Sequence, residues 1–441
     1  MKLFSFRGGV HPPYSKELSK DRPVQGAGIP DLLVVPLVQH IGAPCEAVVS
    51  SGDSVKEGQL LGKPRGFVSA PVHSPVSGTV KKIEKVLHPL GQLVPAVSVQ
   101  PDGKEEKGYL APLGDKIEQL DEKQIVDRVM EAGIVGLGGA TFPAHVKFSP
   151  PKEKPIDTFI INGCECEPYL SADHRLMLER SRDIITGAKM IGKVLRVSRI
   201  IVAVEENKPD ALEAMKRAAG SENIVCMVTE TKYPQGAEKV LIKALLGREV
   251  PSGGLPMDVG VVVSNVGTAL AVCEAVREGK PLIDRIVTLT GNGVSTPGNF
   301  LVKIGTPLSF LVEKAGGLTG TTGKIIMGGP MMGLAQATLD VPVIKGTSGV
   351  LILQEEPSMH EGYLPCIKCS FCVQSCPVSL LPSKLSVIAE AKNWKLAEAY
   401  GANDCIECGC CAYVCPSKRP IVQFIKTAKL KLREIKAREK K

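Results

Sequence analysis

Two cysteine runs of the same spacing constrain this chain of 441 residues more than any other feature. Each run reads C-x2-C-x2-C-x3-C-P. The cysteines are Cys366, Cys369, Cys372 and Cys376 in the first run, and Cys405, Cys408, Cys411 and Cys415 in the second. Three closely spaced thiolates can hold three corners of a [4Fe–4S] cube. The sequence therefore predicts two [4Fe–4S] clusters.

The fourth cysteine of each run is expected to ligate the cluster of the other run. This predicts two crossed sets, Cys366, Cys369 and Cys372 with Cys415, and Cys405, Cys408 and Cys411 with Cys376. Zinc is disfavoured because its sites usually use C-x2-C pairs and stop at four ligands. Disulfides are typical of small secreted chains, and we find no signal-peptide pattern in this long one. Two adjacent clusters of this kind pass single electrons.

Composition predicts a multidomain globular protein with several β-rich parts, since 44% of the residues are hydrophobic and the chain has 45 Gly and 33 Pro. No apolar run approaches the ~20 residues that span a bilayer. Most of the net charge of +8 lies after residue 420, where eight Lys or Arg stand against two Glu. This confined tail does not indicate nucleic-acid binding. It is either a solvated helix or a helix that docks on a membrane surface or a partner.

Short strands separated by turn dipeptides are predicted between residues 32 and 100. The phrases that begin at Gly52 and at Ala70 resemble the barrel-sandwich fold of biotinyl and lipoyl carriers. A carrier lysine would lie on a hairpin tip, and Lys63 falls nearby without the Met or Asp neighbours of the carrier motifs. We interpret this part as a structural or docking barrel.

A glycine-rich loop forms a second centre of interest, with Gly136, Gly138 and Gly139 ahead of Lys147. Glycines let a backbone approach a ligand, and exposed N–H groups before a helix suit a phosphate. Alone, this loop is as consistent with a structural turn. Apolar strands and helices alternate after it, and polar residues follow the strand ends, at 162–168, 205–207 and 264–268. This alternation predicts an open α/β sheet with ligand-binding groups at the carboxyl ends of its strands.

These motifs appear in the same order as in the NADH-binding flavoprotein subunit of respiratory complex I, which the segment therefore resembles. Together with the N-terminal segment, the barrel and the paired cysteine runs, they resemble the C subunits of Rnf (Rsx) ion-translocating electron transport complexes over nearly the whole chain. The resemblance implies a Rossmann-like domain that binds FMN with NADH stacked over it. It also implies a small β-grasp (soluble-ligand-binding-like) domain after it.

Several site residues are implied by this resemblance. The FMN cradle would contain Gly136, Gly138, Gly139 and Lys147, with Asn162 and Asn265 as polar contacts. Glu165 and Glu167, expected as catalytic residues, would line the flavin and nicotinamide side with Glu205 and Glu206. The chain departs from the family pattern at Leu137, Thr141, Cys164 and Cys166. Cys164 and Cys166 are interpreted as free thiols facing the flavin pocket and not as metal ligands.

The expected fold class is α/β multidomain, with helices between the cysteine runs as in α-helical ferredoxins. The expected units are an irregular segment 1–30, a barrel-sandwich domain 31–105, an FMN/NADH-binding domain 106–275, a β-grasp domain 276–350, a two-cluster ferredoxin domain 351–420 and a basic amphipathic tail 421–441.

The expected function is that of an electron-transfer subunit in a membrane-bound ion-translocating complex. It would exchange a hydride between NAD(H) and FMN and pass electrons through the clusters to membrane partners or ferredoxin-like carriers. Its expected location is peripheral, on the cytoplasmic side of the membrane. Two alternatives stay open: the diaphorase subunit of a soluble flavin iron–sulfur oxidoreductase, and a flavin-free subunit that only wires clusters together. The direction of flow and the ion moved do not follow from the sequence.

Overall fold

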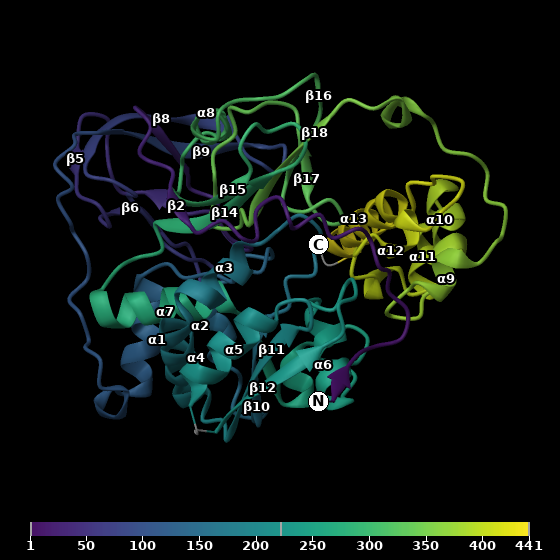
Figure 1. The fold of residues 1–441 in the computed structure, drawn as a ribbon, viewed down its shortest axis with the longest axis horizontal. Coiled ribbons are helices and arrows are strands. Elements are labelled where there is room, and N and C mark those ends of the chain that lie inside the picture. Colours follow the sequence, from purple (N-terminus) through teal and green to yellow (C-terminus); the bar gives the residue numbers. More distant parts are fainter. Residues whose placement is uncertain (1, 221–222, 440–441) are drawn as a thin grey trace.

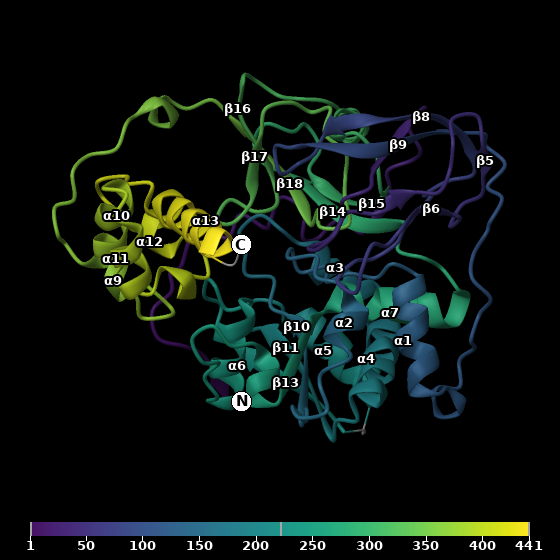
Figure 2. The ribbon, with the colours of Figure 1, turned by 180° about the vertical axis from the view of Figure 1, so that it is seen from behind.

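The computed structural model describes residues 2–220 and 223–439, and it shows four packed units (Figure 1). A β-barrel unit lies at one end of the molecule and a small helical unit with both cysteine runs lies at the other. An α/β unit and a β-grasp unit fill the space between them, and the view from behind shows the same order (Figure 2). The four expected architectures are all present.

The barrel unit contains two antiparallel sheets. One has the strand order β3-β9-β8-β5 and the other β4-β6-β7. The strands are β3 (Leu33–Pro36), β4 (Glu46–Ala47), β5 (Ser54–Val55), β6 (Leu60–Lys63), β7 (Val72–His73), β8 (Gly78–Leu87) and β9 (Leu93–Pro101). Inward residues such as Val35, Leu61 and Val97 are fully buried between the sheets. Lys63 and Arg65 pair with Glu46 on the neighbouring strand.

The α/β unit is built on a parallel sheet of order β1-β12-β11-β10-β13. Its strands are β1 (Leu3–Phe4), β10 (Thr158–Gly163), β11 (Arg199–Glu205), β12 (Ile224–Thr229) and β13 (Val261–Asn265). Its helical segments are η1 (Ile117–Gln119), α1 (Glu122–Glu131), α2 (Ala144–Lys147), α3 (Ala172–Glu179), α4 (Ser181–Leu195), α5 (Pro209–Ala219), α6 (Glu238–Leu246), η2 (Pro256–Val259) and α7 (Val266–Glu278).

Helices cover both faces of this sheet, which explains why its strands read as continuous apolar runs. Phe159 and Ile161 of β10 join the core with α4, α5 and α7. Ile160, between them, packs in a separate core against α6. Successive side chains of a strand point to opposite faces. The alternation therefore buries every residue of the strand and leaves only its carboxyl end for polar groups.

The β-grasp unit has a six-stranded sheet of order β17-β16-β18-β14-β15-β2. Its elements are β14 (Asp284–Thr290), β15 (Gly298–Lys303), α8 (Leu308–Lys314), β16 (Thr322–Met327), β17 (Leu334–Gln336) and β18 (Gly349–Gln354). Leu308, Leu311 and Val312 of α8 pack on the sheet. The turn between β16 and β17, residues 328–333, leaves this unit toward the helical one.

The helical unit follows η3 (Pro357–His360) and a long connection (Figure 1). It contains α9 (Phe371–Gln374), α10 (Pro382–Glu390), α11 (Trp394–Ala399), η4 (Ala402–Asp404), α12 (Cys410–Tyr413) and α13 (Ile421–Glu439). The apolar residues of the basic tail belong to this unit, because Ile421, Ile425, Ala428 and Leu432 are buried in its core. The apolar face of the tail is thus occupied within the chain.

The N-terminal strap, residues 2–30, has more structure than its irregular sequence predicted. β1 extends the sheet of the α/β unit, and β2 (Gln25–Gly26) extends that of the β-grasp unit. Between these strands, Gly9 donates a backbone hydrogen bond to Ser375 of the helical unit. The strap therefore connects three units. Within the described residues, no helix has the length and apolar character needed to cross a membrane.

Candidate functional site

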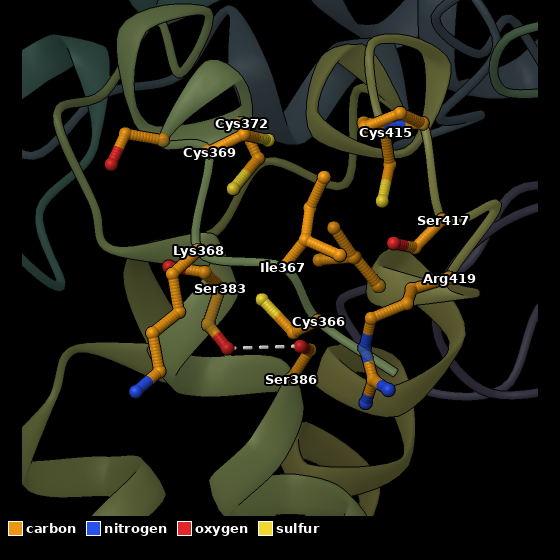
Figure 3. A pocket seen from close by; sticks show the side chains of 13 residues that line it. Cys366, Ile367, Lys368, Cys369, Cys372, Ser383, Ser386, Cys415, Ser417 and Arg419 are labelled. Atoms are coloured by element: carbon orange, nitrogen blue, oxygen red, sulfur yellow. Dashed lines mark hydrogen bonds between the residues drawn. The ribbon is translucent and has the colours of Figure 1, made fainter. Parts of the chain in front are cut away.

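The first thiol cavity lies in the helical unit and is lined by Cys366, Cys369, Cys372 and Cys415. Their sulfur atoms point toward a common space, beside Ile367 and Ser417 (Figure 3). Three of the cysteines come from the first run and the fourth from the second. This is one of the two crossed sets that the spacing predicted.

The second thiol cavity is lined by Cys376, Cys405, Cys408 and Cys411, the other crossed set. Pro377, Leu380 and Ile425 complete an apolar lining that excludes water. Lys429 of α13 donates hydrogen bonds to the carbonyl of Cys405 (2.9 Å) and to Oε1 of Glu407 (2.5 Å). A cation therefore stands beside this set.

Backbone geometry explains why both runs form the same turn. Lys368 and Ser370 have φ of 58° and 66°, and Glu407 and Gly409, in equivalent places, have φ of 60° and 86°. These left-handed residues alternate with the cysteines and turn the sulfurs inward before a short helix begins, at α9 or α12. The three non-glycine residues are strained in this conformation, and such strain is typical of functional sites.

The two sets have the donor chemistry of cluster sites. Within residues 2–220 and 223–439, no three His, Cys, Asp or Glu side chains converge closely enough to share one metal ion. The four sulfurs of each set therefore stand farther apart than the ligands of a single zinc ion, around a space lined only by apolar groups and thiols. The residues present fit [4Fe–4S] clusters.

The carboxyl edge of the parallel sheet gathers the polar residues predicted after its strands. Asn162 and Asn265 are register partners on β10 and β13, and Glu205 lies at the end of β11. Asn162 Nδ2 donates to the carbonyl of Gly236 (2.8 Å), and its Oδ1 accepts from Cys164 N (3.0 Å). Asn265 Oδ1 accepts from Gly267 N (2.8 Å) and so caps α7. Both asparagines are thereby held rigidly.

The glycine loop lies against this edge. A Cβ added to Gly138 would come within 3.5 Å of Asn265 Cβ, an ordinary contact, and one added to Gly139 would meet nothing within 4 Å. By contrast, a Cβ on Gly163 would come within 2.6 Å of Met177 Sδ. Packing therefore requires Gly163, whereas Gly138 and Gly139 leave room on the open side of the loop. Gly139 also has φ of 109°, which side chains rarely adopt.

Unpartnered polar atoms are buried near the same edge. In the described part of the chain, both polar atoms of the Gln235 side chain lack a hydrogen-bond partner, as does Oε1 of Glu205. Gln235 is fully buried and precedes Gly236, whose carbonyl binds Asn162. Buried polar atoms normally find partners. These atoms and the open glycine loop fit a polar cofactor such as FMN.

Leu137 and Thr141, the departures from the flavoprotein pattern, leave the loop intact. Leu137 is buried against the start of α7, and its N–H donates to Thr268 Oγ1 (2.9 Å). Thr141 takes the left-handed conformation with φ of 50°. The leucine side chain thus points into the protein core, and the threonine makes the turn that a glycine would otherwise make.

The two carboxylates expected to be catalytic both have protein partners. Glu165 accepts from the backbone N–H groups of Asp173 (2.9 Å) and His174 (3.3 Å) at the start of α3. Glu167 accepts from Met331 N (3.0 Å) and Met332 N (2.9 Å) of the turn after β16. Burial raises the pKa of Glu167 to about 7. Glu167 therefore connects the α/β unit to the β-grasp unit.

The other predicted residues divide into buried and exposed. Glu205 is 1% exposed and pairs with the equally buried Lys208 (2.5 Å). Glu206 is exposed and accepts from Thr231 N (3.2 Å). Lys147, at the end of α2, pairs with Glu238 of α6 (2.5 Å). The structure brings Asn162, Glu165 and Glu205 together at the sheet edge, while Lys147 reaches across to α6.

Cys164 and Cys166 are free and buried by their own loop. Cys164 Sγ lies 3.3 Å from Thr229 Oγ1, and Cys166 Sγ accepts from Gly236 N (3.3 Å). Burial raises the pKa of the Cys164 thiol to about 12. These thiols stay protonated and support the loop.

Sequence reasoning missed several residues of this site. Lys16 of the strap is buried and donates to the carbonyls of Glu165 (2.6 Å) and Leu170 (2.5 Å). Asp173 accepts from Asn265 Nδ2 (2.6 Å), and burial together with the charge of Glu165 raises its pKa to about 7. Lys208 could have been found from its position three residues after Glu205. Nothing in the local sequence marks Lys16.

Four families match this chain in separate segments. Residues 4–104 match the RnfC barrel sandwich hybrid domain, and residues 129–274 match the Nuo51 FMN-binding domain. Residues 286–335 match the SLBB domain, and residues 365–418 match the 4Fe–4S dicluster domain. Their order is that of the four observed units.

Three relatives align over almost the whole chain, and each is the C subunit of an ion-translocating complex. That of the proton-translocating ferredoxin:NAD(+) oxidoreductase complex of Clostridium ljungdahlii is 47% identical over 99% of this chain and 96% of its own. That of the Na(+)-translocating complex of Acetobacterium woodii is 44% identical over 100% and 99%. That of the ion-translocating oxidoreductase complex of Rhodobacter capsulatus is 42% identical over 100% and 85%.

A solved structure shares the fold at lower similarity. The NAD+-reducing [NiFe]-hydrogenase in the H2-reduced state aligns over 73% of this chain and 63% of its own, with 20% identity and a TM-score of 0.50. This likeness concerns the fold alone.

Proposed function

The chain belongs to the family of C subunits of ion-translocating ferredoxin:NAD(+) oxidoreductase complexes, and from this premise we propose that it exchanges electrons between NAD(H) and the other subunits. The observation that carries the proposal is the presence, in one chain, of an open glycine loop at a flavin-type sheet edge and two crossed thiol sets. When bound, FMN splits the electron pair of a hydride into single electrons, and each [4Fe–4S] cluster carries one electron at a time.

We propose that the glycine loop holds FMN. Gly136, Gly138 and Gly139 would present backbone N–H groups to it, and Lys147 would add a positive charge near its phosphate. The capped side chains of Asn162 and Asn265 give this edge a fixed shape. The unpartnered atoms of Gln235 would receive hydrogen bonds that the protein itself does not supply.

The acidic residues are proposed to line the flavin and nicotinamide side. Glu165 and Glu167 fix the loop after β10 through their backbone partners, and Glu205 holds a buried charge next to it. Glu206, which is exposed, is the carboxylate free to accept a hydrogen bond from a ribose hydroxyl.

The two thiol sets are proposed to act in a fixed order. Cys376 and Cys408 of the second set contact the strap and the α/β unit, because Gly8 packs on the Cys376 carbonyl and Tyr233 donates to the Cys408 carbonyl. The first set lies toward exposed apolar residues, namely Leu364 (64%), Ile367 (67%) and Phe371 (52%). The second set would therefore exchange electrons with the flavin, and the first with a partner.

The chain would act as a peripheral subunit on the cytoplasmic side of the membrane, with other subunits of the complex, ferredoxin-like carriers and NAD(H) as its partners. The proposed domain boundaries are those expected from the sequence, with the strap and α13 joined to their neighbours by the contacts described above.

The direct test is anaerobic purification of the full chain, with flavin, iron and NADH-dependent bleaching measured together. We expect FMN near one per chain and about eight irons, as two [4Fe–4S] clusters require. Gly139→Ala should lose most of the flavin and keep its iron, because Ala is strained at φ of 109°.

Gly103→Ala is the matched control, since Gly103 also has positive φ (72°) and open space but lies in the linker. Equal flavin loss in both variants would mean that backbone strain alone disturbs the fold. Wild-type protein with iron and no flavin would support the flavin-free alternative.

The crossed ligand sets can be tested by paired Cys→Ser variants and EPR spectroscopy of the reduced protein. Cys376→Ser and Cys405→Ser should alter the same cluster signal, and Cys415→Ser and Cys366→Ser the other. If Cys376→Ser instead altered the signal affected by Cys366→Ser, the sets would not be crossed.

A further inference from the structure

One buried junction joins the second thiol set to the flavin-site loop. Its core contains Val10 of the strap, Tyr233 of the α/β unit, and Cys408 and Cys410 of the helical unit, with Cys166 and Met331 packed against them. Three units and the strap therefore meet at one apolar point. Tyr233, 1% exposed, is at its centre.

Tyr233 contacts the helical unit through its side chain and its backbone. Its hydroxyl donates to the carbonyl oxygen of Cys408 (2.7 Å), and its own carbonyl lies 3.8 Å from Cys410 Sγ. Its N–H and carbonyl also pair with Val10 (2.9 Å each). The tyrosine is thus fixed on every side, and its one polar side-chain atom binds a residue of the thiol set.

The same stretch of chain reaches the flavin-site loop three residues later. Gly236 donates to Cys166 Sγ (3.3 Å) and accepts from Asn162 Nδ2 (2.8 Å). A Cβ on Gly236 would come within 2.3 Å of the Cys164 carbonyl, so the loop is packed directly on this backbone. Residues 233–236 therefore form a short link between the flavin-site edge and the second thiol set.

A second contact runs in parallel through the turn after β16. Glu167 binds the backbone of Met331 and Met332, and a Cβ on Gly409 would lie 2.9 Å from the Met331 carbonyl. Gly409 is adjacent to Cys408. The flavin-site loop thus contacts the second set by two routes, of which only the Tyr233 route ends in a hydrogen bond to a residue of the set.

We propose that Tyr233 is a positioning residue for electron transfer: its hydroxyl fixes the second thiol set against the flavin-site loop and polarises the Cys408 peptide. This inference rests on the proposed function. A fixed separation matters because misplacement of reacting groups by even a small distance slows transfer. A hydrogen bond to the carbonyl also favours extra negative charge on the set that Cys408 belongs to.

The test compares Tyr233→Phe with Tyr14→Phe in the full chain purified anaerobically. The control is closely matched, because Tyr14 also donates its hydroxyl to a backbone carbonyl, that of Thr231, at 2.7 Å, but within reach of the α/β unit alone. Both substitutions remove one oxygen and leave the ring in place.

Three measurements separate a positioning role from a merely structural one. In Tyr233→Phe, flavin content and the rate of flavin bleaching by NADH should match wild type. Subsequent reduction of the iron–sulfur chromophore should slow about three- to tenfold, as loss of one hydrogen bond predicts. In a redox titration, one cluster should shift to a more negative midpoint potential and the other should not move.

The third measurement, amide hydrogen exchange of the cofactor-free chain, should show faster exchange around residues 405–411 in Tyr233→Phe and unchanged exchange in Tyr14→Phe. Wild-type potentials and chromophore reduction in Tyr233→Phe would overturn the proposal. A wild-type chain that lacks flavin or does not bleach with NADH would instead refute the proposed function, which distinguishes the two failures.

Discussion

At the scale of single residues, burial decides what an ion pair contributes. Glu205 and Lys208 are three residues apart and each 1% exposed at the side chain, with 2.5 Å between Nζ and Oε2. Glu213 and Lys216 have the same spacing on α5 with side chains 62% and 34% exposed. Only the first pair would leave a charge in the protein interior if one partner were lost.

Glu205→Gln should therefore destabilise the cofactor-free chain by roughly 3–5 kcal/mol, because Lys208 would keep a buried charge without its partner. Chemical denaturation followed by circular dichroism measures this change.

Glu213→Gln is the control and should change stability by no more than about 1 kcal/mol, as exposed pairs do. A similar small loss in Glu205→Gln would mean that Lys208 finds another partner or becomes neutral.

At the scale of elements, α13 shows how an amphipathic tail is used. Its inward residues pack on α10 and α11, and its cations face outward or bind the helical unit. Leu432 is 3% exposed and Leu430, two residues earlier, is 54% exposed. The helix is therefore a structural part of the thiol-set unit, and only its polar side is available to a membrane or a partner.

Leu432→Lys should destabilise the helical unit and lower the iron content, because it places a charge in a packed core. Leu430→Lys should leave the iron content unchanged. Iron per chain after anaerobic purification measures the difference, and equal iron in both variants would mean that α13 is dispensable for holding the clusters.

Lys429 makes a more specific contribution, since its ammonium group binds the Cys405 carbonyl and Glu407. Lys429→Met removes a positive charge beside the second set. The midpoint potential of that cluster should fall by on the order of tens of millivolts, because negative charge added on reduction is then less stabilised.

Lys436→Met provides the control, because Lys436, on the same helix, pairs with Glu398 and contacts no cysteine. A redox titration followed by EPR spectroscopy measures both variants. Equal potentials in wild type and Lys429→Met would show that Glu407 cancels the effect of the lysine.

At the scale of the whole molecule, Lys345 connects three units through one ammonium group. It belongs to the β-grasp unit, is 1% exposed, and donates to the carbonyls of Pro71 in the barrel (2.8 Å) and Gly133 in the α/β unit (2.7 Å). Burial lowers its pKa to about 8. The charged form is thus disfavoured where the three units meet.

The sign of the pH dependence follows from this direction. Between pH 8 and the ordinary lysine pKa of about 10.4, the unfolded chain binds more protons at this residue than the folded chain, so stability rises with pH. The apparent unfolding temperature of wild type should gain from this term over that range, and Lys345→Met should lack the gain.

Lys345→Met should also be less stable than wild type at all pH values, because two buried carbonyls lose their donor. Lys81→Met, at an exposed position of the barrel, should follow the wild-type profile. Parallel profiles for Lys345→Met and wild type would show that another group causes the pH dependence.

The sequence by itself determined the local chemistry. The spacing of the cysteines predicted the two crossed sets because the ligands of a cluster must lie a fixed few residues apart on a tight turn. The alternation of apolar strands and helices predicted the sheet, and the polar residues after its strands predicted which edge would hold Asn162, Glu205 and Asn265. These features depend on neighbours in the chain.

Tertiary structure alone decided how the units meet. The contacts of Lys16 with Glu165, of Tyr233 with Cys408 and of Lys345 with Pro71 and Gly133 join residues more than a hundred positions apart. Such contacts leave no periodicity in the sequence, because each depends on the packing of whole units. The same reason explains the tail, since its amphipathic pattern was equally compatible with a lipid surface and with the core it occupies.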